Sequence, residues 1–423
     1  MKINQTVSRQ QGLSLRIVQT KKFKTNQFVF KFRSRLNEND VTARALIPYI
    51  LQSSTKKWPT TADFRSHLDE LYGAGASVDV NKKGEYHILS FAVDIPNERY
   101  LKDPTPLAKE ALNVLKEMLF NPLLEGDSFS PKVIEQEKRT LKQKLQALKD
   151  DKMRYASQRL VEEMCKGEAY ALHPNGSEEK LNQVTAEELY KAYRNMIEKD
   201  TVDLYVVGDV DSEAITSYCQ KEFHFPEREP VTKPDVKSIN TTDAKEVVES
   251  QKIKQGKLNI GYRTNIVYGD DDYIPLTVMN GLFGGFPHSK LFLNVREKES
   301  LAYYAASRVE SHKGLVVVMS GVEPAKVERA ALIIEEQLQA IQNGEVSENE
   351  LNQTKAVLKN QMLETLDASR GIVEVLYQGE VADAPVDIDR WFEKVDAVTA
   401  DHVIAAAKKL KKDTTYILTS GEE

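Results

Sequence analysis

The sequence predicts an α+β protein of two homologous domains, each an antiparallel-rich sheet with helices on one face. The first observation behind this prediction is an internal repeat with a period near 215 residues, too long for a solenoid and typical of a duplicated domain. The second is that each half contains hairpin-like strand pairs interrupted by helix pairs, without strict βα alternation. The length of 423 residues accommodates two domains at about 150 to 200 residues each.

The repeat is visible in two helices that recur in the same order. Residues 184–187, Val-Thr-Ala-Glu, recur as Val-Thr-Ala-Asp at 398–401, and each copy begins a Thr-capped helix that leads into a strand. Upstream, residues 130–145 align without a gap to residues 347–362. The two matches lie 214 and 217 positions apart, which predicts the same topology in both halves.

A polar, proline-interrupted segment separates the two copies. We therefore expect an N-terminal domain over 1–222, a linker over 223–250 and a C-terminal domain over 251–423. Apolar periodicity predicts strands at 14–19, 27–32, 76–80, 86–95, 257–264 and 314–322. It predicts helices at 42–54, 61–72, 104–119, 130–165, 274–283, 288–298, 324–342 and 347–370.

Composition excludes several classes of function. The chain carries 58 basic and 64 acidic residues, a net charge of −6, and no uninterrupted basic block, so we expect no nucleic-acid binding. It has no apolar run of about 18 residues and no signal-peptide pattern at its start, so we expect a soluble, cytoplasmic protein with no membrane partner. Two cysteines without a C-x-x-C spacing indicate neither a disulfide framework nor a thiolate zinc site.

Four segments together resemble one known family. They are Gly284-Gly285 leading into 290–309, the segment 55–80, Asn-Pro-Leu-Leu at 121–124 and His-Pro-Asn-Gly at 173–176. Taken together, and in their order along the chain, they resemble the insulinase/pitrilysin family of zinc metallopeptidases, which includes the mitochondrial processing peptidase. The resemblance covers both halves of the chain.

The family's zinc site is absent from the positions that should carry it. Its H-x-x-E-H motif places two histidine ligands and a general base on one helix. Anchored on residues 55–59, the motif falls on 45–49, where Ala45 and Tyr49 replace the histidines and Pro48 replaces the glutamate. No two of the seven histidines lie closer than 20 residues in the sequence, so no helical two-histidine ligand set replaces the motif.

The family's second zinc helix carries two glutamates seven residues apart, of which the later binds zinc. Here the earlier position matches Glu137 and the later falls on Lys144. An ammonium about 4 Å from Zn²⁺ would be repelled by about 8 kcal/mol at an effective dielectric near 20. We therefore expect no catalytic residue, no metal and no cofactor in this chain.

The C-terminal half keeps a different family feature. Family members bind substrate peptide with an arginine and, seven residues later, a tyrosine, and Arg296 and Tyr303 keep this spacing. Both side chains can donate to a peptide carbonyl or an oxyanion. The structural alternative is that Arg296 pairs with a neighbouring glutamate and Tyr303 packs in a core; Tyr304 is a competing hydroxyl.

The resemblance implies a non-catalytic peptidase subunit that supplies Arg296 and Tyr303 to a zinc-bearing H-x-x-E-H paralogue, with zinc only in that partner. The alternative is a stand-alone peptide-binding or scaffold protein that adds extended peptides to a sheet edge. A third hypothesis, an active zinc metallopeptidase, is disfavoured by the missing ligands. The peptide substrate, the pathway, the identity of the partner and any homodimerisation are left open by the sequence.

Overall fold

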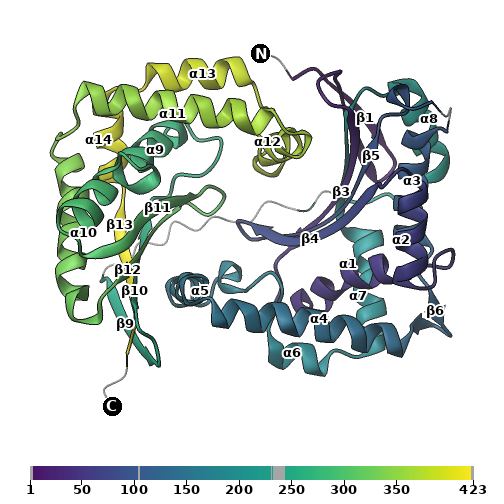
Figure 1. Cartoon of the computed structure of the whole chain (residues 1–423), viewed down its shortest axis with the longest axis horizontal. Coiled ribbons are helices and arrows are strands. Elements are labelled where there is room, and N and C mark those ends of the chain that lie inside the picture. The colour runs from purple at the N-terminus through teal and green to yellow at the C-terminus, as the bar shows by residue number, and fades with distance from the viewer. Residues whose placement is uncertain (1–2, 103–104, 230, 232–242, 421–423) are drawn as a thin grey trace.

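The structure is a computed structural model that describes residues 3–102, 105–229, 231 and 243–420. Two sheets with flanking helices face each other across the molecule, one from each half of the chain (Figure 1). Within the described residues, no helix is both long and apolar enough to cross a membrane.

The first half contributes a six-stranded sheet, seven longer helices and one short helix. Its strands are β1 (Gln5–Gln10), β2 (Leu13–Gln19), β3 (Thr25–Arg35), β4 (Gly75–Lys83), β5 (Tyr86–Pro96) and β8 (Thr201–Gly208), with a small hairpin of β6 (Leu124–Glu125) and β7 (Ser128–Phe129). Its helices are α1 (Val41–Ser53), α2 (Thr61–Glu70), α3 (Leu107–Phe120), α4 (Pro131–Asp150), α5 (Lys152–Met164), α6 (Glu178–Gln183), α7 (Ala186–Lys199) and α8 (Ser212–Glu222).

The second half contributes a five-stranded sheet. Its strands are β9 (Lys245–Gln251), β10 (Gly256–Arg263), β11 (Ala302–Glu310), β12 (Leu315–Val322) and β13 (Lys411–Ser420). Its helices are α9 (Tyr273–Asn280), α10 (Val327–Gln342), α11 (Glu348–Leu366), α12 (Ser369–Ala382), α13 (Ile388–Ala397) and α14 (Ala400–Lys408), with the π-helical turns η3 (Gly281–Gly285) and η4 (Leu291–Lys298) after α9.

The two sheets have the same topology. The first runs β4-β5-β3-β8-β2-β1 and the second runs β11-β12-β10-β13-β9, so every strand of the second has a counterpart in the first. Each sheet has one parallel pair at equivalent positions, β2 with β8 in the first and β9 with β13 in the second. The other pairs are antiparallel. The predicted fold class, an α+β duplication with antiparallel-rich sheets, is confirmed.

Equivalent helices also bury equivalent residues. Leu141 on α4 and Leu358 on α11 are both buried, as are Leu189 on α7 and Val403 on α14. Thr185 and Thr399 cap α7 and α14 through the same reciprocal capping box. The repeated Val-Thr-Ala motif therefore encodes a helix start in each half.

Several elements differ from their predicted extents. The predicted helix 130–165 is two helices, because Asp151 ends α4 and caps α5 with its own side chain. The predicted helix 347–370 ends at Leu366, and α12 follows from Ser369. Strand β9 begins at Lys245, inside the predicted linker, of which residues 230 and 232–242 lie outside the described residues. The sequence patterns did not predict β1, β11, α12 and α13 as separate elements.

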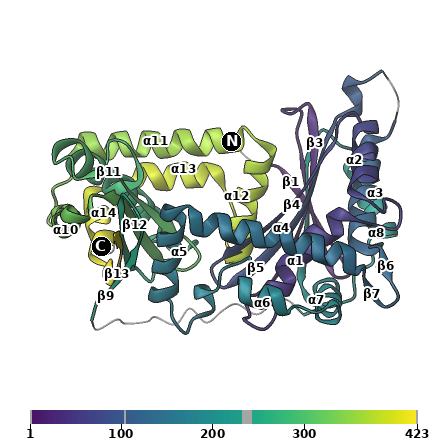
Figure 2. The ribbon, with the colours of Figure 1, turned by 60° about the horizontal axis from the view of Figure 1, so that its bottom comes forward.

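Each sheet is covered on its second face by a helix from the other half (Figure 2). Helix α12 packs Ile372, Val373, Leu376 and Tyr377 into a core shared with strands of the first sheet, where Tyr377 meets Tyr205 edge to face. Helix α5 packs Ala156 and Leu160 on strands of the second sheet. The sequence predicted helices on only one face of each sheet. In the structure each half also supplies a helix that covers the second face of the other half's sheet.

Basic side chains of both sheets bind the exchanged helices, among them one arginine on β3 and one on β10. Arg33, near the end of β3, donates to the carbonyl of Glu380 on α12 at 3.3 Å. Arg263, at the end of β10, donates to the carbonyl of Met164 on α5 at 2.8 Å and pairs with Glu168 and Asp413 at 2.6 and 2.7 Å. Both arginines reach the C-terminal end of the exchanged helix, where the helix dipole favours a cation.

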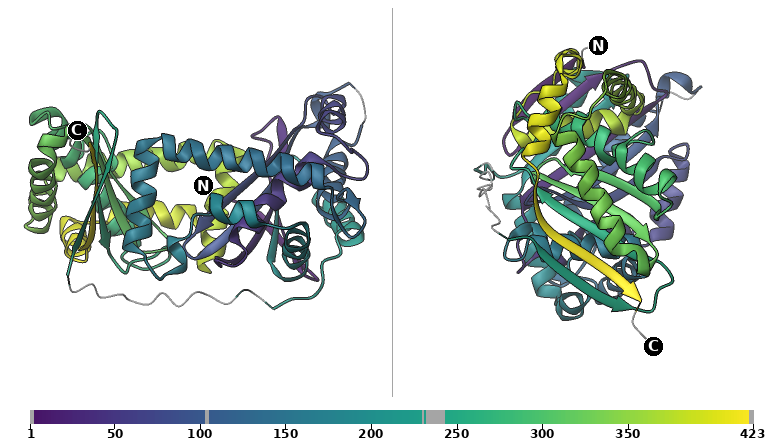
Figure 3. Two further views of the ribbon diagram at one scale, coloured as in Figure 1. Left: turned by 90° about the horizontal axis from the view of Figure 1, so that it is seen from below. Right: turned by 90° about the vertical axis from the view of Figure 1, so that its left-hand side faces the viewer.

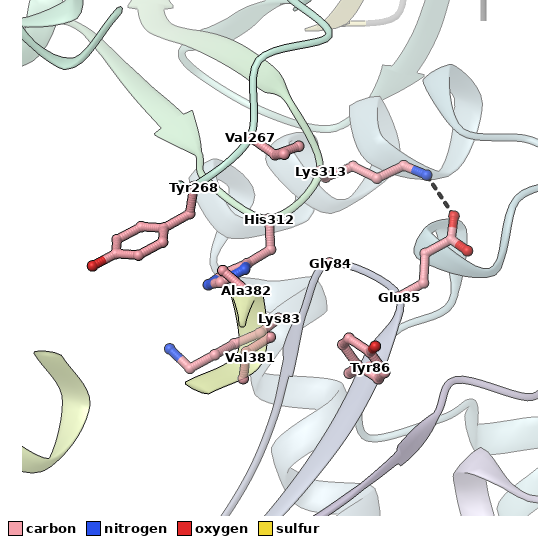
Figure 4. Close-up of a pocket in the computed structure, with 10 residues that line it drawn as sticks. All are labelled: Lys83, Gly84, Glu85, Tyr86, Val267, Tyr268, His312, Lys313, Val381 and Ala382. Carbon is pink, nitrogen blue, oxygen red and sulfur yellow. Dashed lines mark hydrogen bonds and ion pairs between the residues drawn. The ribbon is translucent and has the colours of Figure 1, made fainter. Parts of the chain in front are cut away.

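The two sheets also touch at their hairpin tips. Gly84, in the turn between β4 and β5, lies so close to the turn between β11 and β12 that a Cβ there would be 2.5 Å from the His312 carbonyl oxygen. Lys313 pairs with Glu85 across this junction, beside a small cavity of about 110 Å³ (Figure 4). The halves are therefore joined at their tips as well as through α5 and α12, and helices α4 and α11 span the space between them (Figure 3).

Candidate functional site

A surface hollow of about 420 Å³ lies between α1, the edge strand β4 and α4. It brings together Tyr49 from the first helix and Lys144 from the second, two positions that the family resemblance assigned to a degenerate zinc site. Sequence separation between them is 95 residues. The fold places Tyr49 and Lys144 side by side. That these two positions correspond to the family's zinc ligands remains a prediction.

The contact between Tyr49 and Lys144 is both a hydrogen bond and a cation–π interaction. Lys144 Nζ donates to Tyr49 Oη at 2.9 Å and lies 4.3 Å from the centroid of the tyrosine ring. In the part of the chain that the structure describes, Lys144 has no carboxylate partner within ion-pair distance. The hollow thus holds a protein cation that no acidic side chain neutralises directly.

The other two motif positions do not reach the hollow. Ala45 is fully buried in the first core, and Pro48 is buried inside α1. Proline has no backbone N–H to donate to the carbonyl four residues earlier, at Arg44. The Arg44 side chain is held by Asp200 at 2.6 and 3.1 Å.

Glu137, the glutamate on α4 that matches the family's second zinc helix, is hydrogen-bonded in the wall of the hollow. Glu137 is buried and lines the hollow, where its Oε1 accepts from the Ser53 hydroxyl and from Gln136 Nε2. Among the described residues, no group of three or more His, Cys, Asp or Glu side chains is arranged to hold a metal. The residues at this site do not fit the zinc ion that the family implies.

Three histidines are packed inside the protein. Burial lowers the pKa of His87 to about 3, with Arg44 adding to the effect, and lowers those of His173 and His312 to about 4. His173 Nδ1 accepts from the Asn175 N–H at 3.1 Å. This contact gives His173 a structural role in its turn.

Arg296 and Tyr303 lie in the second half, on either side of the junction between η4 and β11. The Arg296 side chain is 43% exposed, lies over the Phe292 ring at 4.6 Å, and approaches Glu297 at 3.5 Å. Tyr303 is 65% exposed. Tyr303 is therefore not a core aromatic, and the contact of Arg296 with Glu297 is a loose surface pair.

A β-bulge sets the position of Tyr303. Ala302 pairs with Val322 and Tyr304 pairs with the next residue, Gly321, so Tyr303 is the extra residue on β11. Tyr304 instead lies over Gly321, where a Cβ would be 2.4 Å from its ring. The Tyr304 hydroxyl is buried without a hydrogen-bond partner among the described residues, and burial raises its pKa to about 12. Of the two candidate hydroxyls, Tyr303 is the accessible one.

Strand β4 is a further feature of the site that the sequence did not show. It is the edge strand of the first sheet, and Ala76, Ser77 and Val78 line the hollow. Its counterpart β11 is the edge of the second sheet and carries Tyr303. The duplication therefore places the two candidate sites at corresponding edges, a relation that only sheet order reveals.

The fold and this site define a metallopeptidase-like protein whose described residues offer no metal-binding group, and comparison with known proteins identifies its family. Residues 183–358 match the family model described as Peptidase M16 inactive domain. The chain is 51% identical over 420 residues to the probable inactive metalloprotease YmfF of Bacillus subtilis, covering 99% of both chains. It is 22% identical to the uncharacterized zinc protease YmxG of the same organism, over 72% of this chain and 73% of that protein.

A solved structure agrees with these relatives. The crystal structure of a conserved protein from Enterococcus faecalis superposes with a TM-score of 0.93 at 32% identity, over 99% of each chain. The chain belongs to the M16 family of peptidases, the insulinase/pitrilysin family, as a degenerate member. It is not expected to be catalytic on its own.

Proposed function

We propose that this chain is the non-catalytic subunit of a heteromeric zinc peptidase. In this proposal Arg296 and Tyr303 hold the substrate peptide, and a paralogue with an intact H-x-x-E-H motif supplies the zinc. The observation that carries the proposal is the contrast between the two sites. The positions that the resemblance assigns to zinc hold groups that do not suit the metal, whereas Arg296 and Tyr303 are exposed and Arg296 makes a loose surface pair with Glu297.

Backbone strain at the second site supports the same interpretation. Ser300 lies between Arg296 and Tyr303 and has a φ of +49°, a left-handed conformation that is uncommon for residues other than glycine. Such strain persists where the surroundings over-determine it and is concentrated at functional sites. The strained residue and the bulge at Tyr303 thus both lie in the short segment that carries the two exposed donors.

The proposal is tested by mixing the purified chain with an H-x-x-E-H paralogue encoded in the same genome. The expected result is a complex on size-exclusion chromatography and peptide cleavage that neither chain shows alone. A paralogue that is fully active by itself, with no gain on mixing, would refute the subunit assignment.

A second candidate is a stand-alone peptide-binding or scaffold protein. The exposed edge of β4 beside the hollow favours it, because an extended peptide can add to such an edge through backbone hydrogen bonds. Peptide binding by the chain alone, together with no effect on any paralogue, would select this candidate. A cytoplasmic location belongs to both proposals and agrees with two cysteines, Cys165 and Cys219, that are free and buried.

A further inference from the structure

We infer that the hollow between α1, β4 and α4 is a subsite for a peptide carboxylate, with Lys144, Tyr49 and Arg65 as its donors. The inference rests on the proposed peptide-binding function and adds the chemical class of the group that is bound. It assigns a binding role to residues that occupy the place of the lost zinc site.

The first argument is the donor capacity of the Lys144 and Tyr49 pair. An ammonium has three N–H donors, and Lys144 directs one of them to Tyr49 Oη. Because the Tyr49 oxygen accepts that bond, its own O–H is available for a second partner. The pair therefore presents two N–H donors and one O–H donor on the hollow, a set that suits the two oxygens of a carboxylate.

The second argument is the charge of the lining. Arg65 on α2 lines the same hollow and, within the described ranges, forms no ion pair. The acidic side chain of the lining, Glu137, is buried in the wall and satisfied by Ser53 and Gln136. Two exposed cations against one hydrogen-bonded carboxylate favour an anionic ligand over a neutral or cationic one.

The third argument is the route by which a peptide reaches these donors. Ala76, Ser77 and Val78 of the β4 edge form one wall of the hollow. Gln52 holds this strand against α1 by donating to the Ala76 carbonyl at 2.9 Å. A peptide lying along β4 would bring either its C-terminal carboxylate or an acidic side chain next to Lys144.

The test measures peptide binding to the full chain by fluorescence anisotropy at low ionic strength, where exposed charge pairs are least screened. The probes are fluorescein-labelled Val/Thr peptides of about ten residues, the upper range of strand length. One ends in a free carboxylate, one ends in an amide, and one is amidated but carries a glutamate near its end. The protein variants are Lys144→Met, Arg65→Met and, as a matched control, Lys132→Met, at an exposed position on the same helix that does not line the hollow.

We expect the carboxylate peptide to bind about tenfold more tightly than the amide, as two exposed charge contacts allow. Lys144→Met should abolish this difference, Arg65→Met should reduce it, and Lys132→Met should preserve it. If the amidated glutamate peptide binds as tightly as the acid, a side-chain carboxylate is sufficient for binding at the subsite. If it binds as weakly as the amide, the subsite requires the C-terminal carboxylate. Equal affinity for acid and amide, or a preference that survives Lys144→Met, overturns the subsite.

The outcome for the subsite is separable from that for the proposed function. Arg296→Ala, measured with the same peptides, reports on the second site alone. A carboxylate preference that depends on Lys144 while Arg296→Ala changes no affinity and no activity of the mixture would retain the subsite and reject the subunit role of Arg296. The reverse pattern would reject the subsite and retain the proposed function.

Discussion

Lys144 donates to the hydroxyl of Tyr49 at 2.9 Å, so two positions that the family resemblance assigns to the zinc site are hydrogen-bonded to each other. A lysine ammonium carries a positive charge and has no lone pair with which to bind a divalent metal ion. The contact therefore bears on two predictions, the failure of this site to bind zinc and its binding of a peptide carboxylate.

Restoring the H-x-x-E-H motif should not restore a zinc site. In the triple variant Ala45→His, Pro48→Glu, Tyr49→His we expect no stoichiometric zinc, because Lys144 repels the ion by about 8 kcal/mol at 4 Å and an effective dielectric near 20. Elemental analysis of the dialysed protein measures the metal. The same triple variant with Lys144→Glu is the matched comparison and should bind more zinc. About one zinc per chain in the triple variant that keeps Lys144 would contradict this prediction.

Asp203 should make the protein less stable as pH rises through the weakly acidic range. Burial, with the nearby charge of Glu380 adding to it, raises the pKa of Asp203 to about 6 from 3.8. Between these values the folded chain retains a proton that the unfolded chain has released, so the free energy of unfolding falls with rising pH. A shift of this size corresponds to about 3 kcal/mol.

The measurement compares urea unfolding of the wild type and Asp203→Asn between pH 4 and pH 7. The unfolding free energy of Asp203→Asn minus that of the wild type should rise by up to about 3 kcal/mol between pH 4 and pH 7, because only the wild type loses stability as pH rises. Asp69→Asn, at an exposed position on α2, controls for the loss of one negative charge. An Asp203→Asn curve parallel to the wild-type curve would be inconsistent with a proton held at Asp203.

Arg263 should be essential for the contact of α5 with the second sheet. Its guanidinium is buried and pairs with Glu168 and Asp413 as well as with the Met164 carbonyl. Removing one partner from a buried ion-pair network leaves uncompensated charge, so Arg263→Ala should lower the free energy of unfolding by about 3–5 kcal/mol. Arg154→Ala, which removes an exposed pair with Asp151, should cost less than about 1 kcal/mol. Equal losses in the two variants, measured by urea unfolding, would show that the Arg263 contacts contribute little to holding α5 on the second sheet.

Local sequence patterns predicted the duplicated fold because each half repeats its own helix starts. The helix caps are local features, and the structure shows them at Thr185 and Thr399. The matched apolar positions are local features too, and the structure buries Leu141 and Leu358. The exchange of α5 and α12 could not be predicted in this way. An amphipathic helix shows that it has an apolar face, but which sheet covers that face depends on contacts across more than 90 residues, such as Arg263 with Met164.

The candidate sites divide in the same way. The family resemblance pointed to Tyr49, Lys144, Arg296 and Tyr303, and the structure places the first two in contact. The sequence did not predict that β4 and Arg65 line the hollow. It also did not predict the bulge that exposes Tyr303 and leaves Tyr304 packed on Gly321. These features depend on strand order and register, which periodicity does not encode.

The central claim is that this chain contributes a substrate-binding arginine to catalysis performed by a partner. The most direct measurement is kcat/KM for peptide cleavage by a mixture of this chain with an H-x-x-E-H paralogue, comparing wild type with Arg296→Ala. Arg329→Ala, at an exposed position on α10, is the matched control. A lost charge-assisted contact to the transition state should lower kcat/KM by about 30- to 1,000-fold for Arg296→Ala and leave the control unchanged. Full activity of the Arg296→Ala mixture, or of the paralogue alone, would contradict the account.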